Sequence, residues 1–186
     1  MNSFQHVLTL ISIIIGLGLA QILTNFNSLI KERKKVRFYW LPIYWAIGTF
    51  FLQVQWWWGI YKAKEIETWN FLFFSFIILN PISMFLASGS VLPKASPDIT
   101  YDLQEYYYSN RRWYFILMAF NPLLDILRHV IFIQEYFHPS NFANLIPLVF
   151  LTSLAFVKNQ TYHIIVTILL TVSLIFFIAA FSFRLV

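Results

Sequence analysis

Three ionisable residues, Asp125, Arg128 and His129, stand inside an otherwise apolar segment and are the strongest candidates for chemistry. Their i, i+3, i+4 spacing places them on one helix face, so Asp125 can pair with Arg128 or with His129. A charge at the centre of a membrane helix costs about 2.5–3.5 kcal/mol on insertion scales, so such residues are functional candidates by default. We expect a polar cavity in which Arg128 contacts an anionic solute, Asp125 is the counter-charge and His129 titrates near neutral pH. The alternatives are a structural salt bridge, or an Arg128 side chain that snorkels to the interface.

Two Asn-Pro pairs, Asn80-Pro81 and Asn121-Pro122, interrupt the third and fourth apolar segments. Each proline lacks an N–H and frees the carbonyl four residues earlier, so we expect a break in each helix, at similar depth. Non-helical backbone at that depth must be buried in protein or line a watery cavity. Two interpretations stay open: proline kinks whose freed groups the Asn side chains cover, which is the commoner case, or a paired solute site.

Further polar side chains lie within the first two apolar segments. Gln21 and Asn25 run beside a series of small residues at every fourth position, which favours close helix packing, either centrally in the bundle or in an oligomer. That series is Ser12, Gly16, Ala20, Thr24 and Ser28. Gln53 precedes three consecutive Trp residues that are typical of an interfacial aromatic belt. We count Gln21, Asn25, Gln53, Asn80 and Asn121 as candidate lining residues of the cavity around Arg128.

Motifs that would name a reaction are missing from the sequence. There is no Cys, hence no thiolate chemistry or Cys-ligated metal. No phosphate-binding Gly loop, HExxH or GxSxG motif occurs. The four His residues lack the spacing of a metal-ligand pair, so neither a metal nor another cofactor is expected. The remaining enzymatic possibility is a lipid-modifying enzyme that uses His129 and Asp125 as an acid–base pair, and it is less favoured than the two non-enzymatic functions given below.

The composition is that of a membrane protein. Hydrophobic residues make up 59% of the 186 residues and charged residues only 11%, whereas a soluble domain has about 25% charged residues. Six segments approach the roughly 20 apolar residues that a spanning helix requires, so we predict an all-α, multi-pass membrane bundle forming one domain over residues 1–186. The predicted spans are residues 4–30, 38–60, 69–92, 113–137, 142–157 and 162–185. The fifth is short, contains a proline, and could be re-entrant.

The connections between the segments carry the charge. Ser96-Pro97-Asp98 looks like a helix start, and the residues after it show an apolar stripe, so we predict a short amphipathic interfacial helix before the fourth span. An ordinary loop is the alternative. The first, third and fifth connections hold nine Lys and Arg, against three on the other side. The positive-inside rule then predicts that both termini are non-cytoplasmic. We expect the bacterial inner membrane, with anionic lipid headgroups rather than nucleic acid as the partner of these basic residues.

Two classes of function fit these features. The first is a small permease or channel for a polar or anionic solute, centred on Asp125, Arg128 and His129. With so few helices, it would need a homo-oligomer. The second is a non-transporting membrane sensor, assembly or effector module that works with a partner protein. Its active surfaces would then be the basic loop 31–37 and the interfacial segment 99–108.

Overall fold

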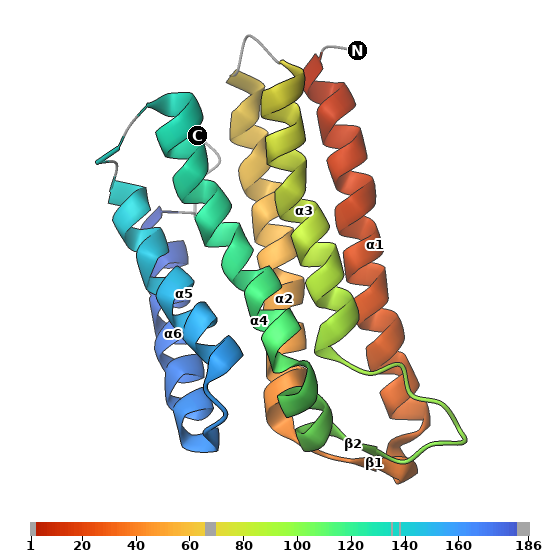
Figure 1. Ribbon diagram of the computed structural model, residues 1–186. Helices are drawn as coiled ribbons and strands as arrows, with labels where there is room; N and C mark the ends of the chain where they lie inside the picture. The colour runs from red at the N-terminus through yellow and green to blue at the C-terminus, as the bar shows by residue number, and fades with distance from the viewer. Residues whose placement is uncertain (1–2, 66–69, 135, 138, 182–186) are drawn as a thin grey trace.

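The computed structural model describes residues 3–65, 70–134, 136–137 and 139–181, and almost all of them are helical. Six α-helices run up and down along one axis (Figure 1). They are α1 (Ser3–Lys31), α2 (Trp40–Gly59), α3 (Phe71–Val91), α4 (Leu103–Arg128), α5 (Pro139–Phe156) and α6 (Gln160–Phe181). Short 3-10 helices, η1 (Arg33–Lys35) and η2 (Ile60–Glu65), follow α1 and α2, and a π-helical turn, η3 (His129–Ile133), extends α4.

The prediction of an all-helical membrane bundle is confirmed, with four helices long and apolar enough to cross a membrane. These are α1 from Phe4, α3, α4 extended to Phe132, and α5, the segment that the sequence left in doubt. α2 is not among these four helices. Its 20 residues include five Trp, one Tyr and two Gln, which lower its mean hydropathy. The described apolar part of α6, Gln160–Ile175, is shorter than a full span. Residues 69, 135 and 182–185 of the predicted spans lie outside the described residues.

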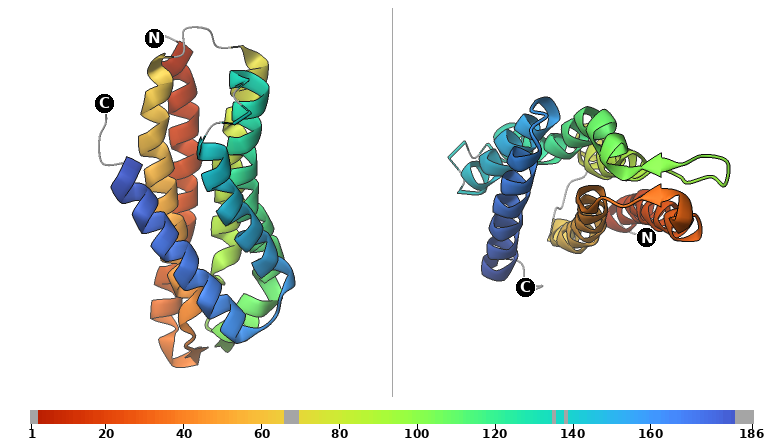
Figure 2. Two further views of the ribbon diagram at one scale, coloured as in Figure 1. Left: turned by 90° about the vertical axis from the view of Figure 1, so that its left-hand side faces the viewer. Right: turned by 90° about the horizontal axis from the view of Figure 1, so that it is seen from below.

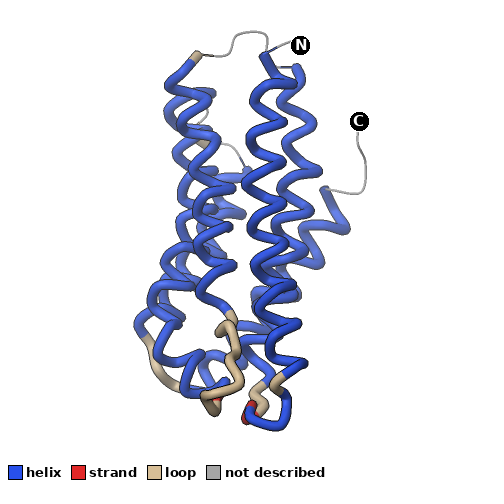
Figure 3. The backbone as a smooth tube through the Cα atoms, turned by 90° about the vertical axis from the view of Figure 1, so that its right-hand side faces the viewer, coloured by secondary structure: helices blue, strands red, loops and turns tan. Residues whose placement is uncertain are grey.

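The helices pack in sequence-distant as well as neighbouring pairs. α3 lies between α1 and α4, and α4 packs most extensively against α5, whereas α6 makes few contacts (Figure 2). A hydrogen bond between the Tyr44 and Thr171 hydroxyls joins α6 to α2. Seen from the other side, the loop segments gather at one end, where β1 and β2 also lie (Figure 3). The main hydrophobic core is richest toward that end, where Trp45 and Phe115 meet edge to face at 5.0 Å.

The predicted helix start at Ser96 is wrong. Residues 97–98 form a turn, and a two-residue parallel pair follows between β1 (Val36–Arg37) and β2 (Tyr101–Asp102). Asp102 is the N-cap instead, and its carboxylate accepts from the backbone N–H groups of Gln104 and Glu105. α4 then runs continuously, so the structure does not confirm a separate interfacial helix. As the N-cap, the Asp102 carboxylate satisfies two N–H groups of the first helical turn, and Ser96 caps no helix.

The predicted helix breaks at Pro81 and Pro122 are also wrong, because α3 and α4 both continue through their prolines. Pro122 frees the carbonyl of Met118, and Asn121 Nδ2 donates to that carbonyl at 3.5 Å, so the Asn side chain supplies part of the bonding that Pro122 removes. Proline is tolerated in membrane helices where a neighbouring polar side chain satisfies the backbone in this way. Asn121 thus covers backbone groups beside its proline, as the kink interpretation expects.

The middle of the small-residue series of α1 does not face another helix of this chain, although its two ends, Ser12 and Ser28, contact Trp57 and the backbone of Ala95. Gly16, Ala20 and Thr24 are exposed, whereas Ile11, Ile15, Ile22, Asn25 and Leu29 form the buried face. The expected central packing through this series is therefore wrong. The close approach occurs at Gly18 instead, where a Cβ would overlap the end of the Gln53 side chain.

Candidate functional site

The ionisable cluster of α4 is present as an ion pair beside a buried histidine. Arg128 Nη2 and Asp125 Oδ1 are 3.5 Å apart, and each side chain is about one-third exposed (35%). His129 is buried, and its Nδ1 lies 2.9 Å from the backbone carbonyl oxygen of Asp125. At 1.5 Å per residue, Arg128 lies about 22 Å beyond Trp113, within about 8 Å of the far edge of a 30 Å hydrocarbon core. The pair is thus local to one helix, and Arg128 is within snorkelling reach of the interface.

Four of the other predicted lining residues, Gln21, Asn25, Gln53 and Asn121, have hydrogen-bond partners away from this ion pair. Asn121 Nδ2 donates to Ser83 Oγ at 2.9 Å, and Ser83 Oγ donates to the carbonyl of Leu117 at 3.2 Å. These bonds hold α3 against α4 beside the two prolines, as the similar depth of the Asn-Pro pairs predicted. Asn80 is buried on α3, and within the described residues its Oδ1 accepts no hydrogen bond.

Gln53 joins three helices. Its side chain is fully buried, Nε2 donates to Ser88 Oγ of α3 at 2.9 Å, and the amide end packs against Gly18 of α1. Trp57, one turn later, donates from its indole N–H to Ser12 Oγ at 2.9 Å. Gln53 bonds to Ser88 of α3, whereas Asp125 pairs with Arg128 on its own helix, so the two residues have different partners. Gln53 is a packing contact between helices rather than a member of the Asp125 cluster.

Asn25 and Gln21 fasten the connection between α3 and α4. Asn25 Nδ2 donates to the carbonyl of Leu92 at 2.9 Å, and its Oδ1 accepts from Gln21 Nε2 at 3.0 Å. One turn further, Ser28 Oγ accepts from the backbone N–H of Ala95 at 2.9 Å. These contacts fix the chain that leaves α3 against the last two turns of α1.

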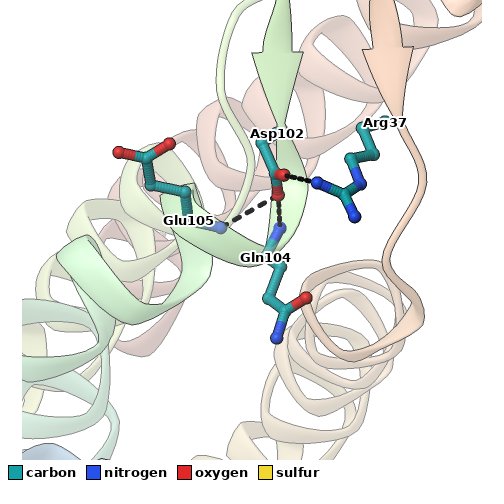
Figure 4. Close-up of polar contacts among 4 residues, drawn as sticks. All are labelled: Arg37, Asp102, Gln104 and Glu105. Carbon is teal, nitrogen blue, oxygen red and sulfur yellow. Dashed lines mark hydrogen bonds and ion pairs between the residues drawn. The ribbon is translucent and has the colours of Figure 1, made fainter.

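The same connection is joined to the loop after α1. Val36 pairs with Tyr101 and Arg37 with Asp102 in the parallel β1–β2 pair, and Arg37 Nη1 lies 3.2 Å from Asp102 Oδ2 (Figure 4). Lys35 Nζ donates to the carbonyl of Pro97. The backbone N–H of Glu105, and less strongly the Gln104 N–H and Arg37, hold the pKa of Asp102 below its usual 3.8, against a raising effect of partial desolvation. Residues 31–37 and 92–112 thus form one structure, which we call the basic platform.

The basic platform concentrates positive charge at one end of the bundle. Eight Lys and Arg lie within it, and Lys158 of the α5–α6 connection lies at the same end (Figure 1). Four acidic residues accompany these nine bases. The bases are Lys31, Arg33, Lys34, Lys35, Arg37, Lys94, Arg111, Arg112 and Lys158. Such a surface attracts anionic groups to that end of the bundle.

An open hollow of about 560 Å³ lies between the first turns of α4 and the α5–α6 connection. Its walls carry both signs of charge, together with amide and hydroxyl groups. The lining residues are Asp102, Gln104, Glu105, Tyr108, Ser109, Arg111 and Lys158. A smaller void of about 10 Å³ adjoins it, lined in part by Arg111 and Tyr107. Hollows of this size range hold small-molecule ligands in other proteins.

A buried histidine positions one wall of this hollow. His163, fully buried in α6, lies with Nδ1 2.8 Å from the Tyr107 hydroxyl and Nε2 2.9 Å from the carbonyl of Val157, next to Lys158. The rings of Tyr107, Tyr108 and Phe115 surround the imidazole at 5.3–5.8 Å. These contacts attach the α5–α6 connection to α4.

His163, Arg111 and Lys158 were not among the site residues predicted from the sequence. The bond that joins their two segments, between Tyr107 and His163, links residues 56 positions apart, so no local spacing signals it. Asn159, which follows Lys158, caps α6, because its Oδ1 accepts from the Tyr162 N–H at 3.0 Å. Within the part of the chain that the structure describes, no cluster of three metal-ligating side chains occurs.

Comparison with protein-family models, with curated protein sequences and with solved structures finds no match to this chain.

Proposed function

We propose that this chain is a non-transporting membrane module of the assembly or effector type, which uses the basic platform to bind an acidic surface of a partner protein. All six helices would cross the bacterial inner membrane, with the basic platform cytoplasmic and both termini on the other side. The observation that carries the proposal is the joining of loop 31–37 to residues 92–102 by the β1–β2 pair and the Arg37–Asp102 ion pair. A binding surface gains affinity when it is held in place before the partner arrives.

The interior of the bundle also supports this class of function. The polar residues that would line a solute path are engaged in contacts between helices: Gln53 with Ser88, and Asn121 with Ser83. Interhelical hydrogen bonds of this kind hold membrane bundles together. A bundle that spends its polar groups on packing suits a scaffold better than a pore.

A photo-crosslinking experiment in the native host tests the proposal. A photoreactive residue at the exposed Lys94 is expected to form a specific protein adduct, and one at Trp58, at the opposite end of the bundle, is not. Arg33→Glu with Lys34→Glu should abolish the Lys94 adduct, whereas Arg33→Lys with Lys34→Arg, which keeps the charge, should retain it. Adducts that are equal at both ends, or insensitive to the charge reversal, would contradict the proposal.

A permease or channel is the second candidate, and the Asp125–Arg128 ion pair with buried His129 favours it. Intramembrane ionisable residues commonly mark solute or proton paths. This function would require the chain to assemble as a homo-oligomer. Reconstituted vesicles loaded with a panel of labelled anions test it: flux that is lost in both Asp125→Asn and Arg128→Gln would replace the docking proposal, and no flux would exclude transport of that panel.

A further inference from the structure

The hollow beside α4 contains charged groups whose binding capacity the fold leaves unused. Within the described residues, Arg37 pairs with Asp102 and Arg128 with Asp125, whereas Arg111, Lys158 and Glu105 have no ion-pair partner there. Arg111 Nη1 donates to the carbonyl of Tyr108, but its buried Nε donates to no described group. Lys158 and Glu105 are exposed on either side. The hollow therefore offers two cations and one carboxylate to a ligand.

The hollow extends outward from the lipid headgroup region. Trp113 and Trp40 are exposed aromatic residues near the platform end of α4 and α2, where an interfacial belt is expected. Arg111 lies about 3 Å and Glu105 about 12 Å beyond Trp113 along α4, at 1.5 Å per residue. The headgroup layer is about 5–7 Å thick on each side of the hydrocarbon core. Arg111 therefore lies within this layer, at the level of a phosphate, and Glu105 lies about 5 Å beyond its outer edge, on the side toward which the ammonium end of a headgroup extends.

We propose that the hollow binds the headgroup of an ethanolamine phospholipid, with the phosphate between Arg111 and Lys158 and the primary ammonium on Glu105. The guanidinium fork matches phosphate oxygens geometrically, and Lys158 adds a mobile point charge. Glu105 accepts N–H bonds from a primary ammonium, which a quaternary choline nitrogen cannot donate. The assignment rests on the proposed function only in placing the basic end at the cytoplasmic leaflet.

The Tyr107–His163 contact positions the site without touching the ligand. The imidazole holds the carbonyl of Val157, and Lys158 is the next residue, so the distance between Lys158 and Arg111 depends on this bond. A site whose charged groups are held by buried neighbours binds more selectively than one on a free loop. Tyr107→Phe should therefore weaken headgroup selectivity while leaving every charge in place.

Native mass spectrometry of the purified full chain, given equimolar phosphatidylethanolamine, phosphatidylcholine and phosphatidylglycerol, tests the proposal. One phosphatidylethanolamine per chain is expected to be retained in preference to the others. Lys158→Gln and Arg111→Gln should each reduce its retention about tenfold, the usual effect of losing one charged hydrogen bond. Glu105→Gln should remove the preference over phosphatidylglycerol. Because Arg111 is partly buried, the exposed Lys158 provides the variant that is safest for folding.

Arg33→Gln with Lys34→Gln is the matched control, since it removes two platform charges away from the hollow and should leave lipid retention unchanged. Soluble glycerophosphoethanolamine identifies the source of the ligand: displacement shows that the free headgroup is sufficient, and its failure shows that the acyl chains are needed. Equal retention of all three lipids, or retention unchanged in Lys158→Gln and Arg111→Gln, overturns the site. If the chain with its native basic loop forms no specific adduct at position 94 but keeps its lipid selectivity, only the docking function is overturned.

Discussion

The contact between Gly18 and Gln53 allows a stability prediction with a built-in control. An alanine Cβ at position 18 would overlap the Gln53 amide oxygen, whereas an alanine at Gly16, half a turn away on the same helix, meets nothing within 4 Å. Gln53 is fully buried and bonded to Ser88, so it cannot move aside without weakening that bond. We therefore expect Gly18→Ala to destabilise the bundle and Gly16→Ala to leave it unchanged or more stable.

The magnitude follows from the difference between the two variants. Alanine is favoured over glycine in a helix by about 0.5–1 kcal/mol at either position, so this effect cancels in the comparison. Overpacking of a filled interior costs about 1–3 kcal/mol. Gly18→Ala should thus be about 1–3 kcal/mol less stable than Gly16→Ala. The measurement is unfolding of each variant in mixed micelles of mild detergent and SDS, followed by the fluorescence of the seven Trp residues.

A double variant separates overlap from other effects. Gln53→Leu shortens the side chain, so in that background Gly18→Ala should lose most of its cost relative to Gly16→Ala. Equal stability of the two single variants would show that Gly18 is not a close-packing position. A penalty for Gly18→Ala that persists beside Leu at position 53 would show that its cause lies elsewhere.

Three further predictions concern named polar contacts. Asp125→Asn and Arg128→Gln should each destabilise the protein in bilayers, by at most about 2.5–3.5 kcal/mol. If the pair is structural, the charge-swapped double variant, Asp125→Arg with Arg128→Asp, should recover most of that loss. A double variant that loses as much stability as the two single variants together would contradict a structural pair. Because the folded-state pKa of Asp102 lies below 3.8, its stabilising effect is complete above pH 3.8 and is lost as the pH falls through the lowered value. Hydrogen exchange of the Arg37 backbone amide should therefore become faster at low pH. In Asp102→Asn this pH dependence should be absent, because the Asn side chain does not titrate but still caps α4. Asn159→Ala should cost about 1 kcal/mol by removing the α6 cap, and Asn159→Asp should restore it.

Helix positions were predictable because the apolar runs are long and their charged ends are abrupt. The predicted boundaries of the first and second spans, 4–30 and 38–60, lie within two residues of α1 and α2. The start of α4 was not predictable, because residues 96–98 carry a reasonable capping pattern of their own. The β1–β2 pairing decided the outcome by fixing Asp102 where it caps α4.

The Asp125–Arg128 pair was predictable from spacing alone, since one helix turn brings the two residues together. The proposed headgroup site was not, because its residues come from both sides of α5 and meet only through the bond between Tyr107 and His163. The orientation of α1 was also undetermined. Its small residues suggest one packing face, but the face that buries Gly18 and Asn25 has the contacts with α2 and the α3–α4 connection.

The three ionisable residues of α4 show the difference between what the sequence determines and what only the tertiary structure decides. The sequence by itself determined a membrane bundle, a basic end and a local ion pair, because hydropathy, loop charge and helical spacing are properties of short segments. Only the tertiary structure decided which polar groups meet across the bundle. Those contacts depend on which helices are neighbours, and in a membrane, where lipid is as apolar as the helix surfaces, neighbours are selected by packing and hydrogen bonding rather than by hydrophobicity.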